Sequence, residues 1–345
     1  MTRSDRASDA SSAMTYFPSD QKKVMKKFGK KALLASLEKM LLIRNFEACG
    51  VAAYQKKLIG GFYHTYAGQE ALQTAVIDVL GVNNWYVTSY RCHALALLLG
   101  ATPNELMAEL YGKANGNAKG RGGSMHFYTE RLLGGFGIVG GQIPIATGSA
   151  LSVKYLKREG EVAVCFMGDG AVAQGAFHES LNIAALWNLP CIYIIENNVW
   201  GMGTNVSRAV SVKGIAEKKA VGYGIKSYNL DGMDYFNCAA GMEQIYREVV
   251  ETSRPVLVEV FTARFDGHSV SDPALYRSKE ELTHYKARDP INLLSNAMIE
   301  AEMLSEEEFK AMGKQQRQIA LAAMEHAEQS PLPNPATLEE EVFAP

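Results

Sequence analysis

The sequence predicts an α/β fold, with a parallel sheet flanked by helices. Three runs, 162–167, 191–195 and 256–261, are apolar throughout, which is typical of parallel strands covered on both faces. A helical pattern of apolar residues separates the first two runs, so this part of the chain is predicted to form a βαβ unit. With 345 residues, 47% of them apolar, the chain is long enough to bury a core of its own.

The composition of the chain argues against nucleic-acid-binding, membrane-spanning and secreted proteins. A formal net charge of −2 gives no general attraction to nucleic acid or to an anionic membrane surface, so neither is expected as a partner. We find no run of the roughly 20 apolar residues that a membrane span needs, and no secretory signal. Arg3 and Arg6 suit a mitochondrial leader, but Asp5 and Asp9 oppose one. We therefore expect the bacterial cytoplasm rather than the mitochondrial matrix. Five scattered cysteines without a C-x-x-C pair are expected to be buried thiols in a reducing compartment.

The N-terminal part is predicted to contain one long helix. Residues 1–25 are polar and lack sustained periodicity, so we expect a loose arm there. Apolar residues then recur at spacings of three and four over 31–57, which predicts a helix. Two glycine-dense stretches further on, 112–123 and 134–141, are expected to be loops.

The C-terminal part is predicted to be helical as far as a proline-rich end. The region after Asp289 has the pattern of an amphipathic helix. Pro331, Pro333 and Pro335 interrupt that pattern, which predicts an extended tail over 331–345. A single domain over 26–330 is therefore expected between the arm and the tail.

Polar residues follow two of the predicted strands. Gly168-Asp169-Gly170 comes after the first apolar run, and Asn197-Asn198 comes after the second. The carboxyl ends of parallel strands meet at one edge of a sheet, where open α/β sheets bind ligands. Asp169 and Asn198 can therefore converge on one ion.

The ion that suits this edge of the sheet is Mg²⁺. Oxygens of Asp169, of Asn198 and of the Trp200 backbone carbonyl are the hard ligands that Mg²⁺ takes, and it commonly adds phosphate oxygens. Gly170 and Ala171 are expected to open the next helix, whose N-terminus favours an anion. The ligand is therefore predicted to be phosphorylated.

Each of the two polar motifs alone is more often an ordinary tight turn. Together, after the strands of one βαβ unit, they resemble the signature of the thiamine-diphosphate-binding fold, here its diphosphate-binding half. Further segments, over about residues 30–300, resemble alpha subunits of the thiamine-diphosphate-dependent 2-oxo acid dehydrogenases, above all those acting on pyruvate. In chain order they are Phe62-Tyr63-His64-Thr65, Ala67-Gly68-Gln69-Glu70-Ala71, Tyr90-Arg91-Cys92-His93, Lys119-Gly120-Arg121-Gly122-Gly123-Ser124-Met125-His126, Gly137-Ile138-Val139-Gly140 and His268-Ser269-Val270-Ser271-Asp272-Pro273.

The resemblance implies which residues bind the cofactor. Tyr90 and Arg91 are expected to bind the diphosphate, because a guanidinium group offers a forked, permanently charged set of donors. Main-chain groups of Gly137 and Val139 are expected to contact the pyrimidine ring, where glycine permits a close approach. His268, after the last predicted strand, is expected beside the diphosphate and the reacting carbon.

The resemblance also implies where the substrate binds. His64 is expected to bind the 2-oxo acid, and Phe62 is expected to limit the size of that acid. His64 and His268 are the candidate catalytic residues, and the sequence does not assign individual proton transfers to them. Other residues in matching motifs are supporting or partner contacts about as often as direct participants: His93, His126 and Gln174. The remaining histidines are expected to be structural: His178, His284 and His326.

The reaction implied by the resemblance is oxidative decarboxylation of pyruvate, with transfer of the acetyl group to a lipoyl arm. The implied partners are a beta subunit, in an assembly of two alpha and two beta chains, and a lipoyl-bearing acetyltransferase component. The alternative is an alpha subunit for branched-chain 2-oxo acids or acetoin; the segments 62–64 and 122–126 favour pyruvate. An NAD-linked oxidoreductase is disfavoured because no G-x-G-x-x-G lies between a strand and a helix. A catalytically silent scaffold subunit is disfavoured because the cofactor motifs are intact.

Overall fold

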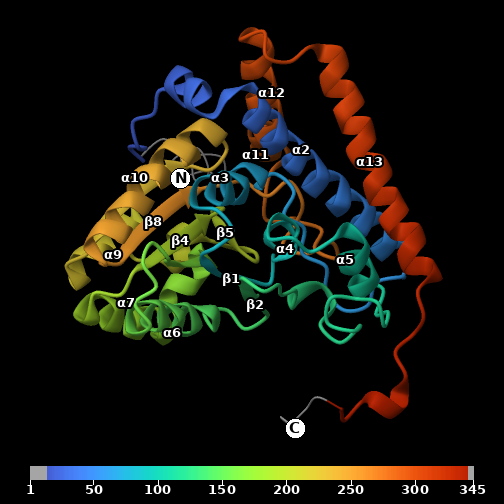
Figure 1. Cartoon of the computed structure of the whole chain (residues 1–345), viewed down its shortest axis with the longest axis horizontal. Coiled ribbons are helices and arrows are strands. Elements are labelled where there is room, and N and C mark those ends of the chain that lie inside the picture. The colour runs from blue at the N-terminus through green and yellow to red at the C-terminus, as the bar shows by residue number, and fades with distance from the viewer. Residues whose placement is uncertain (1–13, 341–345) are drawn as a thin grey trace.

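The computed structural model describes residues 14–340 and is built around one parallel sheet (Figure 1). Its six strands lie in the order β2-β1-β3-β4-β8-β7, and each pairing within it is parallel. The predicted α/β fold is confirmed. The strands are β1 (Trp85–Ser89), β2 (Leu132–Phe136), β3 (Ala163–Gly168), β4 (Cys191–Asn197), β7 (Lys226–Asp231) and β8 (Val256–Phe261).

Helices cover both faces of the sheet because its central strands are apolar on both sides. Val164 and Phe166 of β3 pack into a core that includes residues of α2, α3 and α10. The alternate residues Cys165 and Met167 point to the opposite face and pack with residues of α6 and α7. The covering helices are α2 (Gln21–Gln55), α3 (Glu70–Leu80), α6 (Gln142–Tyr155), α7 (Gly175–Trp187) and α10 (Tyr235–Thr252).

Shorter elements and the C-terminal helices complete the described chain. The short elements are α4 (His93–Leu98), α5 (Pro103–Leu110), η2 (Gly123–Met125), η3 (Asp169–Ala173), β5 (Trp200–Gly201), β6 (Thr204–Asn205), α8 (Val206–Ala209), α9 (Ile215–Ala220), η4 (Val221–Tyr223) and η5 (Pro335–Thr337). The predicted helix after Asp289 is present as two helices. The C-terminal helices are α11 (Lys279–Ala287), α12 (Pro290–Glu300) and α13 (Glu306–Gln329). Figure 1 shows α13 alongside α2, and the two helices are in contact.

Helix α2 begins earlier than the sequence predicts. Asp20 caps it, because its side chain accepts a hydrogen bond from the backbone N–H of Lys23. Val24 and Met25 are buried against the core, so residues 21–25 are helical rather than part of a loose arm. Gly29, with a φ of 72°, kinks the helix and interrupts its periodicity. Residues 1–13 of the predicted arm lie outside the described residues, and the division into arm, domain and tail stays a prediction.

The prediction of a loop over 134–141 is partly wrong. The stretch 134–141 begins within the edge strand β2 and leaves the sheet only after Phe136. A Cβ atom on Gly135 would lie 2.5 Å from the Met125 carbonyl oxygen and 2.6 Å from the Cys92 Sγ atom. The glycine therefore permits close packing within a strand rather than a turn.

The other glycine stretch, 112–123, is a loop held by one buried carboxylate. Glu109 accepts hydrogen bonds from the backbone N–H groups of Ala118, Gly120 and Gly122 at 2.7–2.8 Å. A carboxylate thus organises this loop around itself. All five cysteines are buried, as predicted. In the described part of the chain, none of the helices is both long enough and apolar enough to cross a membrane.

Candidate active site

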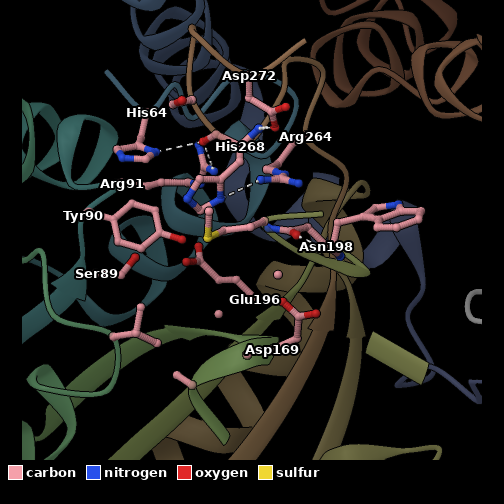
Figure 2. A pocket seen from close by; sticks show the side chains of 18 of the residues that line it. His64, Ser89, Tyr90, Arg91, Asp169, Glu196, Asn198, Arg264, His268 and Asp272 are labelled. Carbon is pink, nitrogen blue, oxygen red and sulfur yellow. Dashed lines mark hydrogen bonds between the residues drawn. The ribbon is translucent and has the colours of Figure 1, made fainter. Parts of the chain in front are cut away.

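A cavity of about 950 Å³ lies at the carboxyl ends of the central strands. Residues that directly follow β1, β3 and β4, and Arg264 three residues after β8, line it, which is the position where open α/β sheets bind ligands. Figure 2 shows side chains from the ends of these four strands pointing toward one another, among them Arg91, Asp169, Asn198 and His268.

The cavity brings together every residue that the sequence predicts for the site. Segments as far apart in the chain as Phe62 and His268 meet there because the parallel strands end at one edge. Their individual roles stay predictions. These residues are Phe62, His64, Tyr90, Arg91, Gly137, Val139, Asp169, Gly170, Ala171, Asn198, Trp200 and His268.

Arg91 is a buried cation in this cavity. Its side chain, 5% exposed, donates hydrogen bonds to the backbone oxygens of Thr65 and His268. Burial, with a further contribution from the nearby Arg264, lowers the pKa of Arg91 to about 10. Among the described residues, no carboxylate forms an ion pair with Arg91, so its charge remains available to an anionic ligand.

Arg264 is a second buried cation, which the sequence reasoning missed. It lies just after β8, is 3% exposed and lines the same cavity. One of its terminal nitrogens lies 3.3 Å from His268 Nδ1, and the other lies 3.3 Å from the Tyr276 hydroxyl (Figure 2 shows the first contact). Its Nε atom is buried and has no partner among the described residues. Its position three residues after the predicted strand 256–261 was the available signal.

The two candidate catalytic histidines are neutral at pH 7. Burial, followed by the charge of Arg91, lowers the pKa of His64 to about 4 and that of His268 to about 3. Their ring centroids are 4.9 Å apart, and the Tyr90 ring lies 4.5 Å from His64 and 5.5 Å from His268. The three rings therefore form one cluster, and the Arg91 guanidinium lies 5.5 Å from the centre of the Tyr90 ring.

Hydrogen bonding assigns a tautomer to each ring. The Nδ1 atom of His64 lies 2.8 Å from the His268 carbonyl oxygen, which can only accept, so Nδ1 of His64 carries the proton. The Nδ1 atom of His268 faces the Arg264 guanidinium, which can only donate, so Nδ1 of His268 is the acceptor. In the neutral rings, Nε2 of His64 is therefore a proton acceptor and Nε2 of His268 is a donor.

Asp169 is a buried carboxylate, and a cation bound beside it would stabilise its ionised form. It is 3% exposed, and burial raises its pKa to about 6, although the charge of Arg264 opposes the shift. No ion pair to Asp169 is present within residues 14–340. A cation at this position would stabilise the ionised form, which fits the predicted metal ligand.

The other two predicted metal ligands lie on the same side of the cavity. Asn198 Oδ1 is 3.4 Å from the backbone nitrogen of Trp200, a long contact that leaves the oxygen able to bind an ion. Between residues 14 and 340 there is no cluster of three or more His, Cys, Asp or Glu that could hold a metal. One carboxylate, one amide oxygen and one carbonyl is instead the sparse set that Mg²⁺ uses when phosphate completes its coordination.

Gly170 and Ala171 do not open the long helix, contrary to the prediction. They belong to the 3₁₀ turn η3, and α7 begins only at Gly175. Gln174 is extended, with a ψ of 143°, and therefore separates the turn from the helix. Gly170 still lines the cavity, where a Cβ atom would meet nothing within 4 Å, so the backbone is open to a ligand.

The loop after β8 is held by Asp272. Its carboxylate accepts hydrogen bonds from the His268 backbone N–H and the Tyr276 hydroxyl, each at 2.7 Å, and from the Ala274 N–H at 2.9 Å. Arg277 adds bonds to the backbone oxygens of 264–266. The loop therefore fixes the position of His268 from both sides.

The remaining candidates have different positions. Phe62 is 60% exposed and lies at the rim of the cavity, with its ring 6.2 Å from that of His64. Gln174 lines the cavity, whereas His126 and the fully buried His93 do not. His93 instead bonds to the Glu47 carboxylate at 3.0 Å. The sequence analysis assigned no role to four further residues that line the cavity: Gln69, Gln142, Glu196 and Tyr276.

The fold and the cavity define a class of protein, an α/β protein with a ligand cavity, lined by two buried arginines, at the carboxyl edge of a parallel sheet. The family described as Dehydrogenase E1 component matches residues 38–336. The chain belongs to this family.

Curated relatives named as E1 alpha subunits cover nearly the whole chain. It is 44% identical over 317 residues to the pyruvate dehydrogenase E1 component subunit alpha of Rickettsia bellii, covering 91% of this chain and 96% of the relative. It is 39% identical over 327 residues to the protein of the same name from Porphyra purpurea, covering 91% and 94%. The alpha-3 chloroplastic subunit of Oryza sativa subsp. japonica is 40% identical over 321 residues, covering 89% and 74%.

Proposed function

We propose that the chain is the alpha subunit of a pyruvate dehydrogenase E1 component, and that it takes part in the oxidative decarboxylation of pyruvate. The names of the relatives above support this function. The structural observation that carries it is the pair Arg91 and Arg264, two buried guanidinium groups in a cavity at the strand ends that form no ion pair with a carboxylate of residues 14–340. Buried cations of this kind require an anion, and a diphosphate supplies one.

The proposed cofactor is thiamine diphosphate with Mg²⁺. Arg91, Tyr90 and the backbone at 170–171 would hold the diphosphate. Asp169, Asn198 and the Trp200 carbonyl would hold the ion, and Gly137 and Val139 the pyrimidine ring. When bound, thiamine diphosphate supplies a carbanion for the substrate ketone and an electron sink for decarboxylation.

His64 and His268 bind and orient the substrate and exchange protons with it. The His64 Nε2 lone pair can accept a proton, and the His268 Nε2–H can donate one to a developing oxyanion. Both rings stay neutral near pH 7 because burial and Arg91 oppose a further positive charge. The site therefore has an acid and a base of the same residue type, distinguished by their hydrogen-bond partners.

The proposed assembly contains two alpha and two beta chains and passes the acetyl group to a lipoyl-bearing acetyltransferase component. The subunit names of the relatives support a beta partner. The bacterial relatives support a location in the bacterial cytoplasm.

Steady-state rates across a set of 2-oxo acids, with the beta chain present, test this proposal. Pyruvate is expected to give the highest kcat/KM. A higher kcat/KM on branched-chain 2-oxo acids, or on acetoin, would contradict it.

A further inference from the structure

We propose that the buried carboxylate of Glu259 is a positioning residue for the Mg²⁺ site. It fixes both ends of the segment 197–216, which carries Asn198 and Trp200, two of the three proposed metal ligands. The inference rests on the proposed function, because it takes thiamine diphosphate with Mg²⁺ as the ligand. Glu259 itself does not line the cavity and acts through the residues that it holds.

Glu259 holds the start of the segment through Asn197. It lies in β8, is 0% exposed and accepts a hydrogen bond from Asn197 Nδ2 at 2.7 Å. The Oδ1 atom of Asn197 accepts the Val199 backbone N–H at 3.0 Å, and because an N–H can only donate, this contact fixes the orientation of the amide. Asn197 is the last residue of β4, so Glu259 ties β8 to the turn that follows β4.

The turn that Asn197 closes is strained. Val199 has a φ of 71°, a region that β-branched residues rarely adopt. Such a conformation persists only where neighbouring contacts hold it. Here the Val199 N–H bonds to Asn197, and the Val199 carbonyl oxygen accepts the Val206 N–H at 2.8 Å. The strained residue lies between Asn198 and Trp200, so its conformation sets the direction of both proposed ligands.

Glu259 holds the other end of the segment through helix α9. Its Oε2 atom accepts the Ala216 backbone N–H at 3.0 Å. This N–H belongs to the first turn of α9, and the N-cap residue, Gly214, has no side chain that could accept it. One carboxylate therefore bonds to both ends of a segment in which residues 198 and 200–203 line the cavity. Loss of either bond releases one end of this cavity wall.

An exchange of the two side-chain types tests the inference with no change in net charge. Glu259→Gln alone places an amide NH₂ group against another donor, either Asn197 Nδ2 or the Ala216 N–H. Asn197→Asp alone places two carboxylates against each other. In the double variant Glu259→Gln/Asn197→Asp, the new amide donates to the new carboxylate, and the backbone N–H groups of 199 and 216 both keep an acceptor.

The quantity measured is the Mg²⁺ concentration that supports half-maximal binding of thiamine diphosphate to the alpha–beta assembly, by titration calorimetry. Each single variant is expected to raise this concentration about tenfold, because a buried hydrogen bond to a charged group is lost. The double variant is expected to return it to within about threefold of the wild type, because the two substitutions compensate each other.

Asn205→Ala is the matched control. Asn205 lies in the same segment, and its Oδ1 atom accepts the Ser207 backbone N–H at 3.0 Å, so the substitution removes a similar local bond that does not involve Glu259. It should leave the Mg²⁺ dependence unchanged. Thermal unfolding checks that every variant folds. If a single variant does not, Asn197→Ala takes its place, because it removes the bond to Glu259 without a repulsive contact, and it must raise the same Mg²⁺ concentration.

The outcomes distinguish this inference from the proposed function. A wild-type assembly that binds no thiamine diphosphate overturns both. Three results overturn only the inference about Glu259 when the wild type binds the cofactor: single variants with the Mg²⁺ dependence of the wild type, a double variant as weak as the single ones, or an equal shift in Asn205→Ala.

Discussion

At the residue scale, burial determines which groups in the cavity carry charge. Burial beside Arg91 lowers the pKa of His64 and of His268, whereas burial raises the pKa of Asp169 because desolvation outweighs the opposing charge of Arg264. A bound diphosphate would raise the pKa of the two histidines, and its metal ion would lower the pKa of Asp169. The cavity is therefore electrostatically adapted to a ligand that contains both an anion and a cation.

The lowered histidine pKa values predict how stability depends on pH. An unfolded histidine binds a proton below about pH 6.5, whereas folded His64 does so only below about 4 and folded His268 below about 3. Between these limits the unfolded state holds more protons, so the free energy of unfolding falls as the pH falls from 6.5 toward 4. Urea unfolding at several pH values should show a shallower fall for His64→Gln than for the wild type. Equal slopes would show that His64 titrates normally in the folded chain.

Asp169 is the charged residue proposed to bind Mg²⁺. Asp169→Ala is expected to weaken magnesium-dependent binding of thiamine diphosphate by about tenfold or more, because the only carboxylate ligand is removed. The thermal unfolding temperature should change little, since the carboxylate forms no ion pair with any residue of the described chain. Titration calorimetry with and without magnesium measures the effect. Unchanged affinity in a folded variant would place the ion elsewhere.

Phe62 is proposed to limit the size of the substrate. Phe62→Ala is expected to raise kcat/KM on branched 2-oxo acids relative to pyruvate by roughly tenfold, because the side chain no longer overlaps the branch. Its exposure at the cavity rim means that the limit depends on what covers the rim. An unchanged ratio in the assembled enzyme would show that selectivity resides in another residue.

At the scale of elements, the strands that the sequence predicted are those buried on both faces. The run at 256–261 coincides with β8, and the two earlier runs match β3 and β4 to within two residues. Strands β2 and β7 were missed because they are at the sheet edges, where glycines and polar residues replace the continuous apolar pattern. Strand β1 was also missed, although it lies inside the sheet, because Thr88 and Ser89 leave it only a short apolar run. The motifs in the sequence predicted residues that meet in one cavity, whereas Arg264 and Gln142 lie outside those motifs, and the structure shows that they line the same cavity.

The loop after β8 carries a prediction because two of its serines differ in burial. Ser269 is 6% exposed, whereas Ser271 is exposed, although their hydroxyl oxygens are only 2.9 Å apart. In the assembled enzyme, Ser269→Glu is expected to lower turnover and to make the loop more sensitive to protease, because the new charge cannot stay in the buried position. Ser271→Glu should do less, since its side chain already faces solvent.

Limited proteolysis and steady-state rates of the two glutamate variants measure this difference. Full activity together with an equally protected loop in Ser269→Glu would mean that the loop tolerates a charge beside His268.

At the scale of the whole molecule, the described residues leave apolar side chains exposed at the rim of the cavity. Phe62, Ile138 and Val139 are 60%, 79% and 45% exposed, and two of them line the cavity. Apolar side chains at the rim of a site are consistent with a surface that another subunit covers. Thiamine chemistry also needs exclusion of water, so the proposed beta chain would complete the site rather than only bind beside it.

The release of carbon dioxide from pyruvate tests this central claim most directly. It is measured with an artificial electron acceptor, thiamine diphosphate and magnesium, for this chain alone, for the beta chain alone and for the two together. The account predicts release only from the mixture, and only when thiamine diphosphate is present. Release by this chain alone, or a mixture that binds thiamine diphosphate but leaves pyruvate intact, would contradict it.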